Sequence, residues 1–87
     1  MNATDRLVLI TSRNHPHNIA AAAEYWAPTG KVVIYVDRDD PNMPAYVDAC
    51  EQAGVEILVG DRFGVRDAAE RYADSYTSVI VTGDGDH

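Results

Sequence analysis

Lys31-Val32-Val33-Ile34-Tyr35-Val36 is a continuous apolar run that follows Gly30 and leads into an acidic loop at 37–42. A strand with one wet face would alternate apolar and polar residues, so this run predicts a strand that is covered on both faces. Three other runs have the same character and predict three further strands: Leu7–Thr11, Val55–Val59 and Ser78–Thr82.

Helical patterns separate the predicted strands. The first helix is expected to have its cap at Asn14 or His15 and Pro16 in its first turn, and to end near 28–30. The second is expected to open at Pro44 and to close at Gly54. The residues expected to face the sheet are Ile19, Ala23 and Trp26 in the first helix, Tyr46, Val47 and Cys50 in the second, and Val65, Ala68, Ala69, Tyr72 and Tyr76 in the third.

This alternation of strands and helices predicts an α/β fold with a parallel sheet, because each crossover helix must pack on a sheet face. We expect residues 1–87 to form a single three-layer, Rossmann-like domain. Its sheet should have four parallel strands in the order 3-2-1-4, with three helices on its faces.

Composition limits the possible classes of function. The 87 residues carry a net charge of −7, which argues against a nucleic-acid surface because such surfaces are basic. Cys50 is the only cysteine, so an intrachain disulfide is impossible and a reducing cytoplasm is the expected location. No run approaches the about 20 apolar residues that span a bilayer, and the first residues lack the pattern of a signal peptide. We therefore expect a cytoplasmic protein that binds neither nucleic acid nor membrane.

Several common chemistries of α/β proteins lack their motifs here. The loop after the first strand, 12–15, contains no glycine, which excludes a dinucleotide-binding fingerprint and a P-loop. No G-x-S-x-G elbow is present, so a serine hydrolase is not expected. The stretch from Asp37 starts like a calcium-binding loop but lacks its central glycine and final glutamate.

Polar residues follow every predicted strand. These groups are 11–14, 37–40, 61–62 and 84–86. The carboxyl ends of parallel strands meet at one edge of the sheet, where ligands of open α/β sheets bind. The last group, Asp84-Gly85-Asp86, places two carboxylates one residue apart, a pattern suited to a divalent cation that also holds phosphate oxygens.

Taken in order, these segments resemble the nucleotide-sugar-binding half of a GT-A fold glycosyltransferase, family 2-like and of the small phage and actinobacterial type. The matching segments are the arginine-containing loop 10–16, the acidic loop 36–41, the glycine and arginine turn 60–65, and Asp84-Gly85-Asp86 as the D-x-D motif. The resemblance covers nearly the whole chain. It implies a site for a nucleotide diphosphate-sugar and for Mn²⁺ or Mg²⁺.

The resemblance also implies roles for particular residues. Asp84 and Asp86, with His87 beside them, would hold the metal, and Asp84 would also contact the nucleotide-sugar. Arginines would give charge-assisted hydrogen bonds to the pyrophosphate. The residues expected to bind the nucleotide-sugar are Thr11 and Ser12 in the base pocket, Asp37 at the base or ribose with Asp39 in the same loop, and Arg13, Arg62 and Arg66 at the phosphates. The alternatives are a solvated tail for the terminal carboxylates and weak surface ion pairs for Arg13 and Arg62.

Two departures from the family bear on catalysis. Glu70 stands where many members carry an asparagine, and the acceptor-binding half that should follow the D-x-D motif is absent from these 87 residues. We therefore expect binding without complete sugar transfer by this chain alone, with the acceptor domain on a possible separate chain. The alternative is a non-catalytic interaction or assembly protein that keeps the fold and self-associates.

The predicted strand order leaves the third and fourth strands at the edges of the sheet. Val79, Ile80 and Val81 would then present an apolar edge with unpaired backbone groups. We expect a homodimer in which the two sheets join through this edge.

Overall fold

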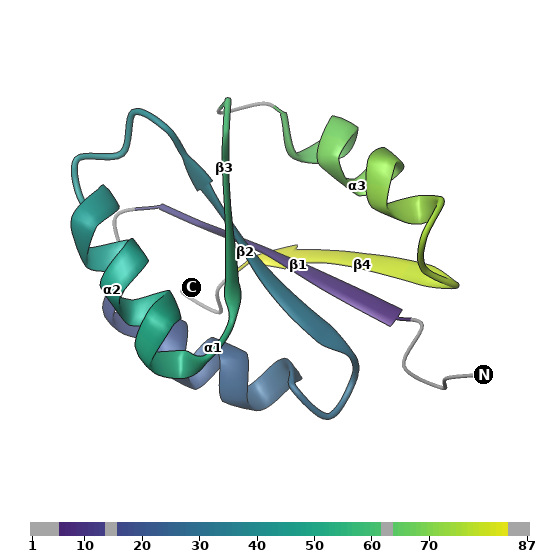
Figure 1. Cartoon of the computed structure of the whole chain (residues 1–87), viewed down its shortest axis with the longest axis horizontal. Helices are drawn as coiled ribbons and strands as arrows, with labels where there is room; N and C mark the ends of the chain where they lie inside the picture. The colour runs from purple at the N-terminus through teal and green to yellow at the C-terminus, as the bar shows by residue number, and fades with distance from the viewer. Residues whose placement is uncertain (1–5, 14–15, 62–63, 84–87) are drawn as a thin grey trace.

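The computed structural model describes residues 6–13, 16–61 and 64–83, and Figure 1 shows their arrangement. Strands and helices alternate along the chain as the sequence predicts. The strands are β1 (Arg6–Ser12), β2 (Lys31–Asp37), β3 (Glu56–Gly60) and β4 (Ser78–Gly83). The helices are α1 (Ile19–Trp26), α2 (Met43–Ala53) and α3 (Val65–Ala73), with a 3-10 turn η1 (Pro16–Asn18) ahead of α1.

The four strands form one parallel sheet in the order β3-β2-β1-β4, which confirms the predicted fold class and strand order. The two inner strands are the most apolar: 7–10 in β1 and 32–36 in β2 are buried. The outer strands are only partly covered, because each has a neighbour on one side. The continuous apolar runs therefore mark strand positions, and their depth of burial follows their place in the sheet.

Helices cover both faces of the sheet. Val8 and Ile10 belong to a core cluster with residues of α1 and α2, and Leu7 and Leu9 belong to a second cluster with Ala68 of α3. Figure 1 shows α1 and α2 on one side of the sheet and α3 on the other. Successive residues of a strand point to opposite faces, so one strand supplies both clusters. The fold is a three-layer α/β sandwich.

The ends of the helices differ in detail from the prediction. α1 begins at Ile19, because the turn that contains Pro16 is 3-10. The expected cap at Asn14 or His15 lies outside the described residues. α2 ends at Gly54, whose φ of 73° is the left-handed conformation that favours glycine, as predicted. α3 ends at Ala73, so Tyr76 lies beyond the helix.

The predicted inward faces of the helices are correct with one exception. Val47 is 48% exposed, so its predicted inward position is wrong. The sheet-facing stripe of α2 runs through Tyr46 and Cys50, and Val47 lies on its flank. Cys50 is buried as expected, and this burial raises the pKa of its thiol. Tyr76, although outside α3, packs edge-on against Tyr72 with ring centroids 6.0 Å apart.

No helix in the described ranges is long and apolar enough to cross a membrane.

Candidate functional site

The carboxyl ends of the four strands lie side by side in the sheet. The register pairs Thr11 of β1 with Gly83 of β4 on one side and with Tyr35 of β2 on the other. Asp37 at the end of β2 pairs with Gly60 at the end of β3. The described members of the polar groups predicted to follow the strands, 11–13, 37–40 and 61, therefore share one edge of the sheet. We call this row of strand ends the carboxyl edge.

At the end of β1, the hydroxyl groups of Thr11 and Ser12 make internal hydrogen bonds. The Thr11 hydroxyl donates to the backbone carbonyl of Thr82 in β4, at 3.3 Å. The Ser12 hydroxyl lies 2.7 Å from the hydroxyl of Tyr46 in α2, and both side chains are buried. Arg13, the next residue, is exposed. The end of β1 is thus tied to β4 and to α2, and an arginine follows at the surface.

At the end of β2, the acidic loop is held by its own carboxylates. The Asp37 carboxylate accepts a hydrogen bond from the backbone N–H of Asp39, at 3.0 Å. Asp40 is buried, and its carboxylate accepts from the N–H of Asn42, at 2.7 Å, just ahead of α2. These contacts are typical of aspartates that fix turns. Asp39 is exposed and Asp37 half-buried at the predicted position beside the carboxyl edge.

At the end of β3, Tyr35 of β2 holds the loop in place. Its ring belongs to the core under α3, while its hydroxyl donates to the backbone carbonyl of Asp61 at 2.5 Å. Burial raises the pKa of Tyr35, and the carboxylates of Asp61 and Asp37 raise it further. The neutral hydroxyl therefore remains the donor across the physiological range. This contact was missed in the sequence, where Tyr35 is one residue of an apolar run.

Gly60 and Gly64 leave room for the Tyr35 hydroxyl. A Cβ on Gly64 would lie 2.7 Å from that oxygen, and a Cβ on Gly60 would come closer still. Gly64 has a φ of −90°, so an L-residue would not strain its backbone. The closest obstacle to a Cβ at this position is the tyrosine hydroxyl.

This geometry predicts that Tyr35→Phe rescues Gly64→Ala. In the native background Gly64→Ala should cost about 1–3 kcal/mol of unfolding free energy, the usual cost of overpacking. With Tyr35→Phe in place, the nearest neighbour of the new Cβ is the Asp61 carbonyl oxygen at 3.3 Å, so the cost should fall by about 1–2 kcal/mol. Urea unfolding of the four members of the double-mutant cycle measures this coupling. Equal costs of Gly64→Ala in the two backgrounds would contradict the contact.

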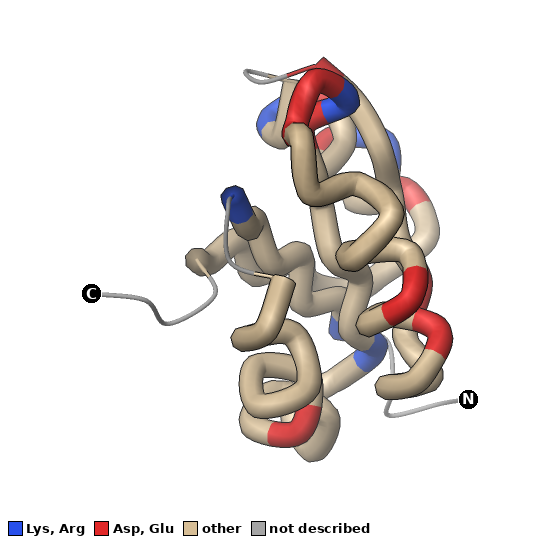
Figure 2. Tube along the Cα trace, turned by 90° about the vertical axis from the view of Figure 1, so that its left-hand side faces the viewer, with Lys and Arg blue, Asp and Glu red and all other residues tan. Residues whose placement is uncertain are grey.

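Charged residues gather where β2 and β3 finish, at the top of the view in Figure 2. Arg38 and Asp61 form an ion pair across the strand ends, Nε to Oδ1 at 3.2 Å, with side chains 59% and 80% exposed. A cavity of about 180 Å³ opens beside this pair, between β3 and α3, and Asp67 and Arg71 of α3 also line it. Arg66, in the first turn of α3, is exposed. Both charge signs are therefore available at this end of the carboxyl edge.

The predicted metal ligands, Asp84, Asp86 and His87, lie outside the described residues, and so does Arg62, the predicted phosphate contact after β3. Within residues 6–13, 16–61 and 64–83 there is no group of three or more histidine, cysteine, aspartate or glutamate side chains suited to a metal ion. Gly83, the last described residue, ends β4 beside Thr11.

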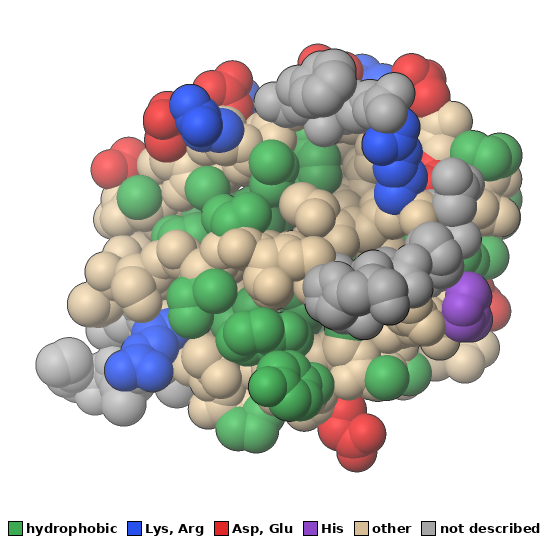
Figure 3. Space-filling model, turned by 180° about the vertical axis from the view of Figure 1, so that it is seen from behind, with side chains coloured by type: hydrophobic (Ala, Val, Ile, Leu, Met, Phe, Trp, Pro, Cys, Tyr) green, Lys and Arg blue, Asp and Glu red, His purple; other side chains and the backbone are tan. Residues whose placement is uncertain are grey.

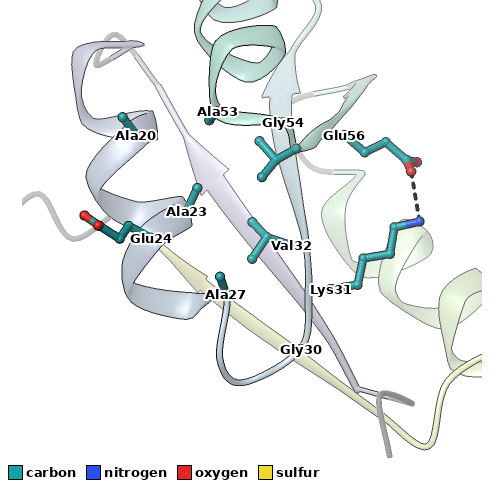
Figure 4. A pocket seen from close by; sticks show the side chains of 11 residues that line it. Ala20, Ala23, Glu24, Ala27, Gly30, Lys31, Val32, Ala53, Gly54 and Glu56 are labelled. Carbon is teal, nitrogen blue, oxygen red and sulfur yellow. Dashed lines mark ion pairs between the residues drawn. The ribbon is translucent and has the colours of Figure 1, made fainter. Parts of the chain in front are cut away.

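A larger cavity, of about 620 Å³, lies at the other end of the strands, where β2 and β3 begin, between α1 and α2 (Figure 4). Alanine, glycine and valine make most of its wall, and Glu24 lies on one side of it. On the other side Lys31 and Glu56 form an ion pair at 3.2 Å, and the pKa of Lys31 is raised by its hydrogen bond to Glu56 and by the charge of that carboxylate. Few polar side chains line this cavity. The carboxyl edge therefore remains the better candidate for a polar ligand, although its cavity is smaller.

Comparison of the chain with protein-family models, with curated proteins and with solved structures finds no match.

Proposed function

We propose that this protein binds a nucleotide diphosphate-sugar together with Mn²⁺ or Mg²⁺ at the carboxyl edge. The observation that supports this most is the strand order. β1 is followed along the chain by β2 on one side, while β4 lies on its other side, so the connections diverge between β1 and β4. Ligands of open parallel sheets bind at such a switch point. In the sequence, Asp84 directly follows Gly83, the residue that pairs with Thr11 there.

The charges around the edge suit a phosphate ligand in the presence of a cation. The chain has a net charge of −7, so a pyrophosphate must be neutralised locally. Arg13 follows β1, Arg66 is the second residue of α3, and the Arg38–Asp61 pair is exposed. An exposed pair of this kind contributes only about 0–1 kcal/mol, so Arg38 can turn to a phosphate at little cost. In this proposal Asp84 and Asp86, with His87, hold the metal.

The end of β2 is suited to the nucleoside part of the ligand. Asp37 lies beside Gly60 in the register, next to the cavity that Arg38 and Asp61 line. Asp37 and Arg38 supply hydrogen-bond acceptors and donors at the end of β2, and Asp61 supplies acceptors on a loop that Tyr35 keeps in place. We assign the nucleoside to this end and the pyrophosphate to the β1–β4 end.

Calorimetric titration of UDP- and GDP-sugars in the presence of Mn²⁺ tests the proposal. We expect sub-millimolar binding that EDTA abolishes and that Asp84→Ala weakens at least tenfold. Asp74→Ala is the matched control: Asp74 is an exposed aspartate after α3, before β4 begins, and its removal should leave affinity unchanged. Absence of binding at millimolar ligand, or equal effects of the two substitutions, would refute the proposal.

A second candidate is a non-catalytic interaction or assembly protein. The observation that favours it is the uncharged edge strand β4, which pairs with β1 alone within the described part of the chain. Such a strand is typical of a surface that pairs with another chain. The same titration separates the two candidates, because an assembly protein has no reason to bind nucleotide-sugars in a metal-dependent way.

A further inference from the structure

β4 is an edge strand without the usual protection against pairing. Among the described residues it pairs with β1 alone, and its other side is open. Natural edge strands are commonly blunted by charged residues, proline or a bulge. Ser78-Val79-Ile80-Val81-Thr82-Gly83 contains no charged residue and no proline, and Val81 is 49% exposed.

The opposite edge strand, β3, is different. Glu56 begins it, paired with Lys31 and hydrogen-bonded at 3.4 Å by the hydroxyl of Tyr72. Asp61 follows its end, paired with Arg38. Charged side chains on an edge strand are one of the devices that prevent it from pairing with another chain. β3 has them at both ends and β4 has none, so β4 is the edge available for pairing.

The surface beside β4 is apolar. Figure 3 shows the molecule from the side opposite to that of Figure 1. Hydrophobic side chains lie above and below a band of backbone, and charged side chains lie around the periphery. On the α1 side, Trp26 packs against the same core cluster as Ile80, and Tyr25 stacks edge-on against Trp26 at 5.2 Å. Tyr25 is 74% exposed. Exposed aromatic residues next to apolar strands are typical of protein interfaces.

We propose that β4 pairs antiparallel with β4 of a second copy of this chain, joining two sheets into one of eight strands. Centred on Ile80, this ladder sets Ile80 opposite Ile80 of the second copy, Val79 opposite Val81 and Ser78 opposite Thr82, so that opposite residues point to the same face. No charge meets a charge, which matters for two molecules that each carry −7. A two-fold axis through the ladder, perpendicular to the sheet, keeps both α1 helices on the same face. The Tyr25 and Trp26 pairs of the two copies then approach each other.

The size of the surface is compatible with a stable dimer. Standard interfaces bury about 800 Å² on each partner, which is roughly a seventh of the 5487 Å² of accessible surface here. A ladder of five residues from each copy falls short of this area. The exposed face of Tyr25 and the half-buried Trp26 lie beside it and supply further area, because aromatic side chains bury about 150–250 Å² each.

Size-exclusion chromatography with light scattering, on the whole chain, tests this inference through two matched variants. Val81→Lys places a charge on the β4 edge, and Val59→Lys places one on the β3 edge, where the valine is 44% exposed. The native chain and Val59→Lys should show twice the monomer mass of 9.5 kDa. Val81→Lys should run as a monomer, with its dissociation constant raised at least tenfold. A native chain that stays monomeric at millimolar concentration, or a dimer that only Val59→Lys disrupts, overturns the inference.

Hydrogen exchange of the native chain gives a readout that does not depend on how Val81→Lys folds. In a β4 ladder, amides of 78–83 should exchange more slowly at high protein concentration than at low concentration, while those of β3 should not change. Concentration-independent exchange in β4 refutes the ladder. Because the two copies repel each other, added salt should strengthen association, and weakening by salt contradicts an uncharged interface. Nucleotide-sugar binding is measured separately, so either proposal can fail while the other stands.

Discussion

Tyr46→Ala is expected to remove about 3–5 kcal/mol of unfolding free energy, as large-to-small changes of buried aromatic residues do. Tyr46 is fully buried and is the largest of the fully buried side chains. It lies in α2 and belongs to the core cluster between α1, α2 and the sheet. A domain of this size has roughly 4–13 kcal/mol of stability in total. The variant should therefore lie close to the limit of folding at room temperature.

Urea unfolding followed by circular dichroism measures this loss. Val47→Ala is the matched control, because Val47 is the next residue of α2 and is 48% exposed. Its cost should stay within about 0.5 kcal/mol, the range of ordinary surface substitutions. Tyr46→Phe keeps the ring and removes only the hydroxyl 2.7 Å from Ser12, so about 0.5–1.5 kcal/mol is expected, the usual net contribution of one hydrogen bond. Similar urea midpoints for Tyr46→Ala and Val47→Ala would show that the ring is not part of the core.

The fold could be predicted from the sequence because its strands are apolar on both faces. The predicted range Lys31–Val36 differs from β2 by one residue, since burial on both faces leaves little else for such a run to form. The parallel sheet followed from the alternation with helices, and the order 3-2-1-4 from the expected Rossmann-like arrangement. Helix ends were less predictable. The 3-10 geometry of 16–18 and the end of α3 at Ala73 depend on tertiary packing and leave no local pattern.

The location of the candidate site at the carboxyl edge could be predicted from the sequence. The contacts of its individual side chains were harder to predict. Ser12 is 34 residues from Tyr46 in sequence, and no local signal links a hydroxyl after one strand to a tyrosine in a later helix. The apolar neighbours of Tyr35 in the sequence indicate a core position. They give no sign that its hydroxyl donates a hydrogen bond to the Asp61 carbonyl. The glycines around Asp61 were the available signal, because close approach of another group is a common reason for glycine at strand ends.

Gly30→Ala is expected to be as damaging as the loss of the tyrosine ring, although it adds a single methyl group. Gly30 precedes β2, and a Cβ there would meet backbone atoms of Arg6 in the neighbouring strand β1. It would lie 2.9 Å from the Arg6 carbonyl carbon and closer still to the carbonyl oxygen. Backbone atoms of a paired strand cannot rotate away as a side chain can. Relief requires β1 and β2 to separate just where Leu7 pairs with Lys31.

A series of three glycines separates this effect from the general cost of adding a methyl group. Gly30→Ala should cost about 3 kcal/mol or more, at the upper end for overpacking. Gly54→Ala has free space but a φ of 73°, so about 1–2 kcal/mol of left-handed strain is expected. Gly83→Ala meets nothing within 4 Å and should stay within about 0.5 kcal/mol of the native chain. Urea midpoints should therefore fall in the order Gly83→Ala, Gly54→Ala, Gly30→Ala. Because β1 and β2 are the inner strands, a Gly30→Ala variant as stable as Gly83→Ala would contradict the pairing from which the carboxyl edge is built.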